Sequence, residues 1–221
     1  MALPCPERND CQICTYTPFV EVSMTVLPLN VPTRDRILDL AEELIQRYGY
    51  NGFSYDDIAR SISIRKPSIH YHFATKAELG AAVAHRYTER FANTLQTITD
   101  TQKTAHSQLQ AYIELFAQTY RRDRRLCLCG MLGAEAEALP QGMRGEIYQF
   151  FLINQEWLAC VLRRGKEDGE FFCAESPESP ESRALLFVAS LEGAMVLGRG
   201  LEASNLVEEV GLALLADLTK R

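Results

Sequence analysis

Hydrophobic residues recur at helical spacing along most of this chain, starting just after residue 32. In the first such stretch, between Thr33 and Gly49, apolar and small side chains lie three and four positions apart. They are Ile37, Ala41, Leu44, Ile45 and Tyr48. This spacing puts them on one face of a helix. We expect Thr33 to cap the start of this helix and Gly49 to end it.

Two short helices and one long helix are expected next. Ser54 followed by Asp57 forms the pattern of a capping box, which predicts the start of the second helix. Pro67 suits a first helical turn, and it opens a third helix of only about six residues. Thr75 and Glu78 repeat the capping-box pattern. They open a long helix that should link the two halves of the protein.

Helical spacing continues to the C-terminus, and no segment alternates as a strand would. Further helices are expected over residues 109–120, 126–139, 143–162, 183–199 and 206–218. Residues 175–182 are acidic and proline-rich, which predicts a loop. The fold is therefore predicted to be all-α. A three-helix helix-turn-helix domain (33–79) would be joined by the long helix to a helical body (80–221).

Composition and charge limit the classes of protein to which this chain can belong. The chain has 221 residues, is 47% hydrophobic and carries a net charge of −6, so nucleic-acid binding would need a local basic patch. No apolar run reaches the length of a membrane span, and the N-terminus lacks a signal-peptide layout, so we expect a cytoplasmic protein. Residues 1–32 hold five prolines and no helical period, which indicates a flexible leader.

A basic patch coincides with the expected helix-turn-helix. No carboxylate lies between Asp57 and Glu78, whereas this interval holds Arg60, Arg65, Lys66 and Lys76. Helix starts at Thr33, Ser54 and Thr75 offer unpaired N–H groups to phosphates. The expected DNA-contacting residues are Thr33, Ser54, Tyr55, Arg65, Lys66, Pro67, Ser68, His70, Tyr71, His72 and Lys76.

Residues 33–79 resemble the DNA-binding domain of the tetracycline-repressor (TetR/AcrR) family. The resemblance lies in a first helix, a short second helix, an aromatic-rich third helix, then Phe73 and a helix start that bears Lys76. It implies that residues 65–72 lie along a recognition helix, that Lys76 clamps a phosphate and that Phe73 seats the third helix on the core. His70 departs from the family, which usually has tyrosine there.

The resemblance extends more weakly over residues 80–221. It implies a ligand-binding body that dimerises through its last two helices, and a repressor that leaves a palindromic operator when a small-molecule effector binds. Expected interface residues are Leu186, Val196, Leu206, Val210 and Leu214, although these helices could also be covered by their own chain alone. Aromatic candidates for the effector site, or simply for the core, are Tyr112, Phe116, Phe150, Phe151 and Trp157.

Cysteine usage gives weaker signals. Cys127 follows the basic run 121–125 at an expected helix start, and both features lower a thiol pKa. The segment also resembles that of family members that respond to reactive electrophiles, which makes Cys127 a candidate sensor. The alternative is an ordinary buried cysteine. Cys11 and Cys14 form an isolated C-x-x-C pair, read as part of a solvated tail, so no metal or other cofactor is expected.

Other classes of function fit the sequence less well. The chain has no nucleophile elbow, Walker-type loop, dinucleotide fingerprint or metal-spaced His/Glu set, so an enzyme is not expected. A helical adaptor that has lost DNA affinity is a further alternative. The cations Arg65, Lys66 and Lys76 speak against it.

Overall fold

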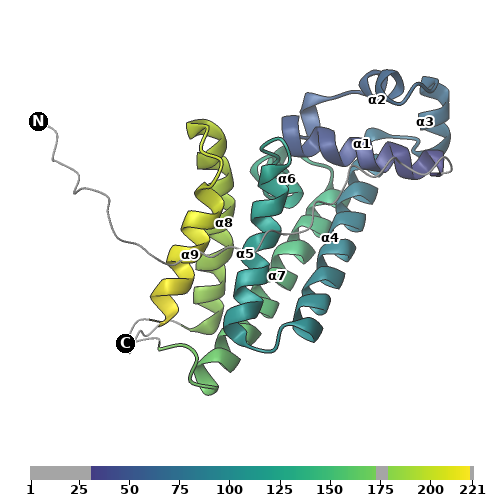
Figure 1. Ribbon diagram of the computed structural model, residues 1–221. Helices are drawn as coiled ribbons and strands as arrows, with labels where there is room; N and C mark the ends of the chain where they lie inside the picture. The colour runs from purple at the N-terminus through teal and green to yellow at the C-terminus, as the bar shows by residue number, and fades with distance from the viewer. Residues whose placement is uncertain (1–30, 173–178, 220–221) are drawn as a thin grey trace, which may run out of the picture. The chain divides into compact units, whose positions relative to one another are not determined.

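A computed structural model describes residues 31–172 and 179–219, and within these residues the chain is helical and has no strand (Figure 1). Three helices form the N-terminal part: α1 (Thr33–Tyr48), α2 (Tyr55–Ser61) and α3 (Lys66–His72), with a 3-10 turn, η1 (Tyr50–Gly52), between the first two. They pack beside the start of the long helix α4 (Lys76–Thr101). The predicted helix-turn-helix layout is confirmed. Most of the expected leader lies outside the described residues.

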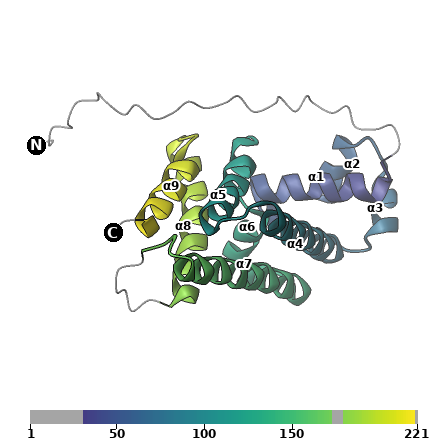
Figure 2. The same ribbon diagram turned by 60° about the horizontal axis from the view of Figure 1, so that its bottom comes forward.

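The remaining helices form the body. They are α5 (Ala105–Arg121), α6 (Leu128–Ala134), the 3-10 turn η2 (Ala136–Ala138), α7 (Gln141–Glu167), α8 (Pro180–Leu201) and α9 (Leu206–Thr219). Helix α7 packs against α4 and α8, and α9 packs against α5 and α8 (Figure 2). Helix α6 contacts α1, which brings the body against the N-terminal domain.

The helices begin at or beside the predicted capping residues, but two of the predicted capping interactions differ in the structure. Ser54 and Asp57 form the expected capping box. Thr33 does not cap α1, because it is the first helical residue, and the carbonyl of Pro32 accepts the N–H groups of the first turn. Thr75 accepts the N–H of Glu78, but the Glu78 carboxylate accepts the N–H of Ala74, so this second box is not closed.

Two expected boundaries in the body are wrong. The helix predicted over residues 126–139 is divided into α6 and η2. Of the loop predicted over residues 175–182, residues 175–178 lie outside the described residues, and the last three residues are helical instead, because α8 begins at Pro180 and the side chain of Ser179 caps it by accepting the N–H of Ser182. A proline is well tolerated in the first turn of a helix, where its missing N–H costs nothing.

Helix α8 is unusually apolar. Its length and composition would allow it to cross a membrane, but a core helix meets the same criterion. Phe187, Leu191 and Met195 are fully or almost fully buried against the rest of the body. The helix is therefore packed as an interior element along one face, while other apolar residues on it face outward.

Candidate DNA-binding surface

Helix α3 is seated on the domain core by two apolar residues and presents its polar side outward. Ile69 and Phe73 are buried. The hydroxyl of Tyr55, on α2, donates to the carbonyl of Phe73 at 3.0 Å and fixes the end of the helix. Tyr71 is 86% exposed, and Arg65, Pro67 and His70 are exposed with it. The exposed face thus carries side chains that can reach base edges.

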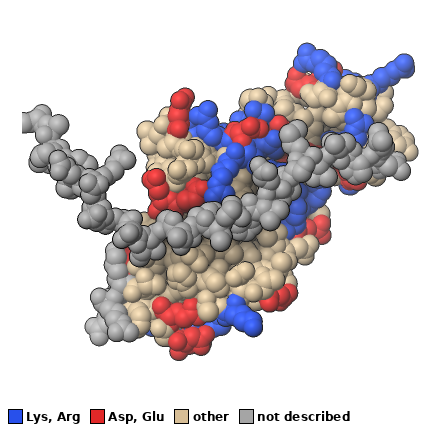
Figure 3. Space-filling view, viewed as in Figure 1, with Lys and Arg blue, Asp and Glu red and all other residues tan. Residues whose placement is uncertain are grey.

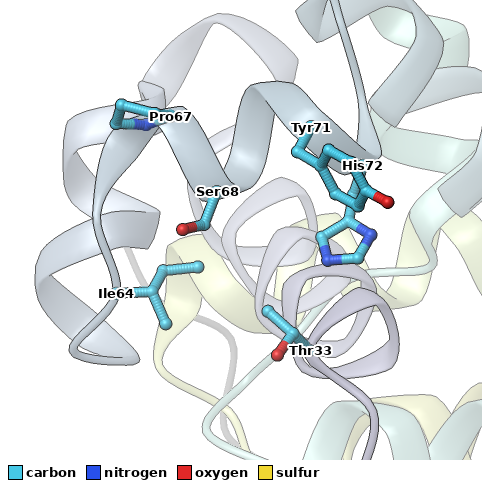
Figure 4. A pocket seen from close by; sticks show the side chains of 6 residues that line it. All are labelled: Thr33, Ile64, Pro67, Ser68, Tyr71 and His72. Atoms are coloured by element: carbon cyan, nitrogen blue, oxygen red, sulfur yellow. The ribbon is translucent and has the colours of Figure 1, made fainter.

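A hollow of about 430 Å³ lies between α3 and the start of α1 (Figure 4). It is lined by Thr33, Ile64, Pro67, Ser68, Tyr71 and His72. Five of these six residues are sequence-predicted DNA contacts, and the structure brings them to one surface. Ile64 is the member that sequence reasoning missed, because an apolar residue between two helices reads as part of the core.

Basic side chains project from the end of the domain that α2 and α3 form (Figure 3). Lys66 pairs with Asp56 at 2.8 Å, and Arg60 pairs with Asp57. All four side chains are well exposed, and such surface pairs are worth little in water. The cations of these pairs can therefore exchange their carboxylates for phosphates.

Two predicted DNA contacts are held inside the domain. Tyr55 is buried, and burial raises the pKa of its hydroxyl to about 12, so it supports α3 and does not lie on the reading surface. The ammonium group of Lys76 lies 4.3 Å from the ring centre of Phe53 and 4.8 Å from that of Tyr50, and it donates to the Phe53 carbonyl. Its partial burial lowers its pKa. Through these contacts Lys76 stabilises the segment between α1 and α2.

The expected effector residues meet in the body. Phe91 on α4 lies at the centre, with ring centres of Phe150 at 4.9 Å, Phe116 at 6.2 Å and Tyr112 at 6.3 Å. Trp157 stacks on Tyr112 at 5.5 Å. Phe91 and its neighbour Tyr87 were not predicted as site residues, although their helical register pointed them inward.

Cys127 has the position expected from the sequence, and its surroundings distinguish the two alternatives given for its chemistry. It is the N-cap residue of α6, yet it is only 2% exposed and burial raises its pKa well above the ordinary value. The guanidinium group of Arg125 is paired with Glu43 at 3.0 Å, and that of Arg121 with Glu114 at 2.9 Å. This burial agrees with the alternative of an ordinary buried cysteine and does not support an accessible low-pKa thiolate.

The expected dimer residues divide between two environments. Leu186 and Val196 on α8 are exposed, together with Leu185, Leu197 and Leu201. On α9, Leu206, Val210 and Leu214 are half-buried, and the last two pack against the core of their own chain. The most exposed large apolar residue of α9 is Leu212. The outward apolar surface is thus mainly on α8.

Known proteins match both the domain and the whole arrangement. The family of bacterial regulatory proteins, tetR family, matches residues 37–83, which span α1 to the first turns of α4. A crystal structure of a TetR transcriptional regulator from Legionella pneumophila is 32% identical, covers 86% of this chain and is itself covered over 99% of its length, with a TM-score of 0.77. The chain belongs to the TetR family.

Two curated TetR-type relatives add to this assignment. The transcriptional regulator AcuR of Cereibacter sphaeroides is 27% identical over 157 residues, which are 70% of each chain. IcaR of Staphylococcus aureus, a negative transcriptional regulator of the biofilm operon icaADBC, is 44% identical over 46 residues, which are 21% of this chain and 25% of IcaR. As a TetR-family member, this chain is a DNA-binding transcriptional regulator with a helix-turn-helix.

The body of this TetR-family protein forms hydrogen bonds with its DNA-binding domain at the C-terminal end of α1. From α8, Arg199 donates to the carbonyls of Gln46 at 2.9 Å and Arg47 at 3.4 Å, and also to that of Arg124 at 3.0 Å. The first two carbonyls belong to the last turn of α1, where a cation is favoured by the helix dipole. Arg199 was not predicted as a functional residue.

A second contact holds the turn after α1. The carboxylate of Glu135, at the end of α6, accepts the N–H of Tyr50 and the side-chain amide of Asn51, both at 3.0 Å. Gly49 has a φ of 80°, and a Cβ there would lie 2.1 Å from a Glu135 oxygen. The positive φ favours glycine at this position, and a side chain there would displace the Glu135 carboxylate from its contacts with Tyr50 and Asn51. Helices α6 and α8 thus each contact the DNA-binding domain directly.

Proposed function

We propose that this chain is a ligand-responsive repressor that binds a palindromic operator as a homodimer and is released by a small-molecule effector. The observation that carries the proposal is the pairing of an exposed, polar α3 with an exposed apolar face on α8. The first can enter a major groove, and the second needs a partner to cover it. IcaR is a negative transcriptional regulator, which supports repression of transcription over activation for this chain. Action on DNA places the protein in the cytoplasm.

In this proposal the DNA contacts come from the predicted residues that reach the surface. They are Thr33, Ser54, Arg65, Lys66, Pro67, Ser68, His70, Tyr71 and His72, with Lys76 acting mainly through the fold of the domain. Effector binding is assigned to the aromatic cluster of the body, where Phe91 contacts Tyr112, Phe116 and Phe150. Phe151 contacts Phe150, Trp157 stacks on Tyr112, and Cys127 lies beside Tyr87.

Selection of bound DNA from a randomised duplex pool tests the proposal. We expect a palindrome whose half-sites are about one DNA turn apart, roughly 34 Å, because two symmetric recognition helices read it. A single half-site would contradict the dimer. Absence of any enriched sequence, with folded protein, would favour a helical adaptor that binds another protein.

Tyr71 is expected to contribute sequence preference. The variant Tyr71→Ala should lose roughly 1–3 kcal/mol of binding free energy at particular base pairs, because an exposed aromatic ring on α3 can contact a base edge or a thymine methyl. The measurement is competition binding against operator variants. Tyr148→Ala on α7 is the control, since Tyr148 is also exposed but lies in the body. Equal losses for all sequences would remove Tyr71 from base readout.

A charge on the outward face of α8 is expected to break the dimer. Leu197 is 59% exposed, and the variant Leu197→Glu should give a monomer in sedimentation equilibrium, because an unpaired charge is costly in an apolar interface. Affinity for the full palindrome should fall by roughly tenfold or more, since the two half-sites are no longer bound together. Tyr148→Glu is the matched control. An unchanged dimer mass would show that α8 is not the interface.

A further inference from the structure

One ionisable residue interrupts the apolar helix α8. Between Arg183 and Arg199 the only charged side chain is Glu192. Its stem is partly exposed, but its carboxyl group reaches α6, where it fills the space beside Gly130 and hydrogen-bonds with the thiol of Cys127. The oxygen Oε1 is buried and has no hydrogen-bond partner among the described residues. A buried polar atom without a partner is costly and calls for a specific reason.

The groups that face this carboxyl group are neutral. They are Cys127 and Cys129 from the α6 segment, Tyr87 from α4 and Tyr112 from α5. No cation of the described residues is paired with Glu192. Burial raises its pKa to about 7, so near neutral pH a substantial fraction carries an uncompensated charge. Buried charges in proteins are normally paired, and here the described residues supply no cationic partner.

The aromatic residues near the Glu192 carboxyl group are a second feature that favours a cation. Tyr87 and Tyr112 belong to the aromatic cluster around Phe91, and Trp157 stacks on Tyr112. The faces of such rings attract cations, most strongly where water is excluded. A carboxylate without a cationic partner, with the aromatic residues Tyr87 and Tyr112 near it, is thus complementary to an organic cation, and it disfavours an anion.

We propose that Glu192 anchors the effector and that the effector carries an ammonium or similar cationic group on an apolar or aromatic body. This inference rests on the proposed ligand response and adds the chemical class of the ligand. The ammonium group would donate to Oε1 and neutralise the carboxylate, while the apolar part packs among the rings. Because Glu192 must lose its proton to form the pair, binding strengthens as the pH rises through its pKa.

The same helix connects this site to the DNA-binding domain. Glu192 and Arg199 are seven residues apart, which places them on the same side of α8, two turns from one another. Glu192 contacts α6, and Arg199 contacts the last turn of α1. A ligand that separates α8 from α6 at Glu192 would therefore disturb the Arg199 contacts with α1.

Three probes that share a phenethyl tail test the proposal: 2-phenylethylamine, 2-phenylethanol and 3-phenylpropionate. Binding to the full chain is measured by calorimetry at pH 6 and pH 8. At pH 8 we expect the amine to bind roughly tenfold or more tightly than the alcohol, and the anion to bind most weakly. The affinity for the amine should rise about tenfold from pH 6 to pH 8, as Glu192 ionises.

Two variants assign the effect to Glu192. In Glu192→Gln the preference for the amine and its pH dependence should both disappear. In Glu137→Gln, which removes an exposed carboxylate in η2, both should remain. Equal affinities for amine and alcohol, no detectable amine binding, or a preference that survives in Glu192→Gln would each overturn the proposal. Palindrome selection is measured separately, so a protein that binds an operator but no amine would retain the proposed function and lose only this inference.

Discussion

Replacing Glu192 with glutamine is expected to raise the free energy of unfolding at pH 8 by about 3 kcal/mol. The carboxyl group has a pKa of about 7 in the folded protein, against an ordinary value of 4.5, because it is buried. The folded state therefore holds this proton more tightly than the unfolded state does. The protonated Glu192 carboxyl group therefore contributes to the free energy of unfolding. This contribution is fully present below pH 4.5 and is lost as the pH rises to about 7.

Urea unfolding between pH 4.5 and pH 8 measures this effect. The stability of the wild type should fall across this interval relative to Glu192→Gln, whose neutral amide cannot titrate. Glu137→Gln makes the same change in net charge at the surface and should follow the wild type. Parallel stability curves for the wild type and Glu192→Gln would show that Glu192 is not a buried titrating group. The experiment requires no ligand, so it examines the site independently of any effector.

The second large effect is expected at the aromatic cluster. Phe150 is fully buried, and its ring centre lies 4.9 Å from that of Phe91, 5.4 Å from that of Phe151 and 5.6 Å from that of Tyr87. Phe150→Ala removes a large side chain that contacts α4 and leaves a cavity. The free energy of unfolding should fall by about 3–5 kcal/mol. That is a large part of the stability of an ordinary domain.

The matched control for Phe150 lies on the same helix. Tyr148 is 64% exposed, and Tyr148→Ala should change the free energy of unfolding by about 0.5 kcal/mol or less. Both variants are compared by urea unfolding at one pH. A loss below about 1 kcal/mol for Phe150→Ala would mean that the neighbouring rings close the cavity, and it would indicate a cluster able to rearrange around a ligand.

The DNA-binding domain could be predicted in some detail because its signals are local. Ser54 and Asp57 are three residues apart and form their capping box within one turn. The burial of Phe73 and the exposure of Tyr71 follow from helical period and the family resemblance. The signals at Thr33 and Thr75 were also local, but Thr33 is the first helical residue and not the cap of α1. Thr75 accepts the N–H of Glu78 as expected, but the Glu78 carboxylate accepts the N–H of Ala74 instead of that of Thr75.

The chemistry of the body depended on contacts that sequence spacing does not contain. A helix start and nearby arginines indicated that the Cys127 thiol could be acidic. In the folded chain the thiol is buried, and Arg125 forms an ion pair with Glu43 on α1. Desolvation then raised the pKa instead of lowering it. Glu192 did leave a signal, as the single charged residue between Arg183 and Arg199 in an apolar helix. Only the structure shows that its carboxyl group turns inward.

The all-α class, the helix-turn-helix and the exposed face of α3 follow from local signals, because helical period, capping and a short proline-led helix act over a few residues. Which polar groups meet depends on how the helices pack. Glu135 accepts from Tyr50 across 85 positions, and Arg199 donates to Gln46 across 153. Such pairs form because helices α6 and α8 pack against α1. Their energies depend on burial and distance in the folded chain, which no local pattern encodes.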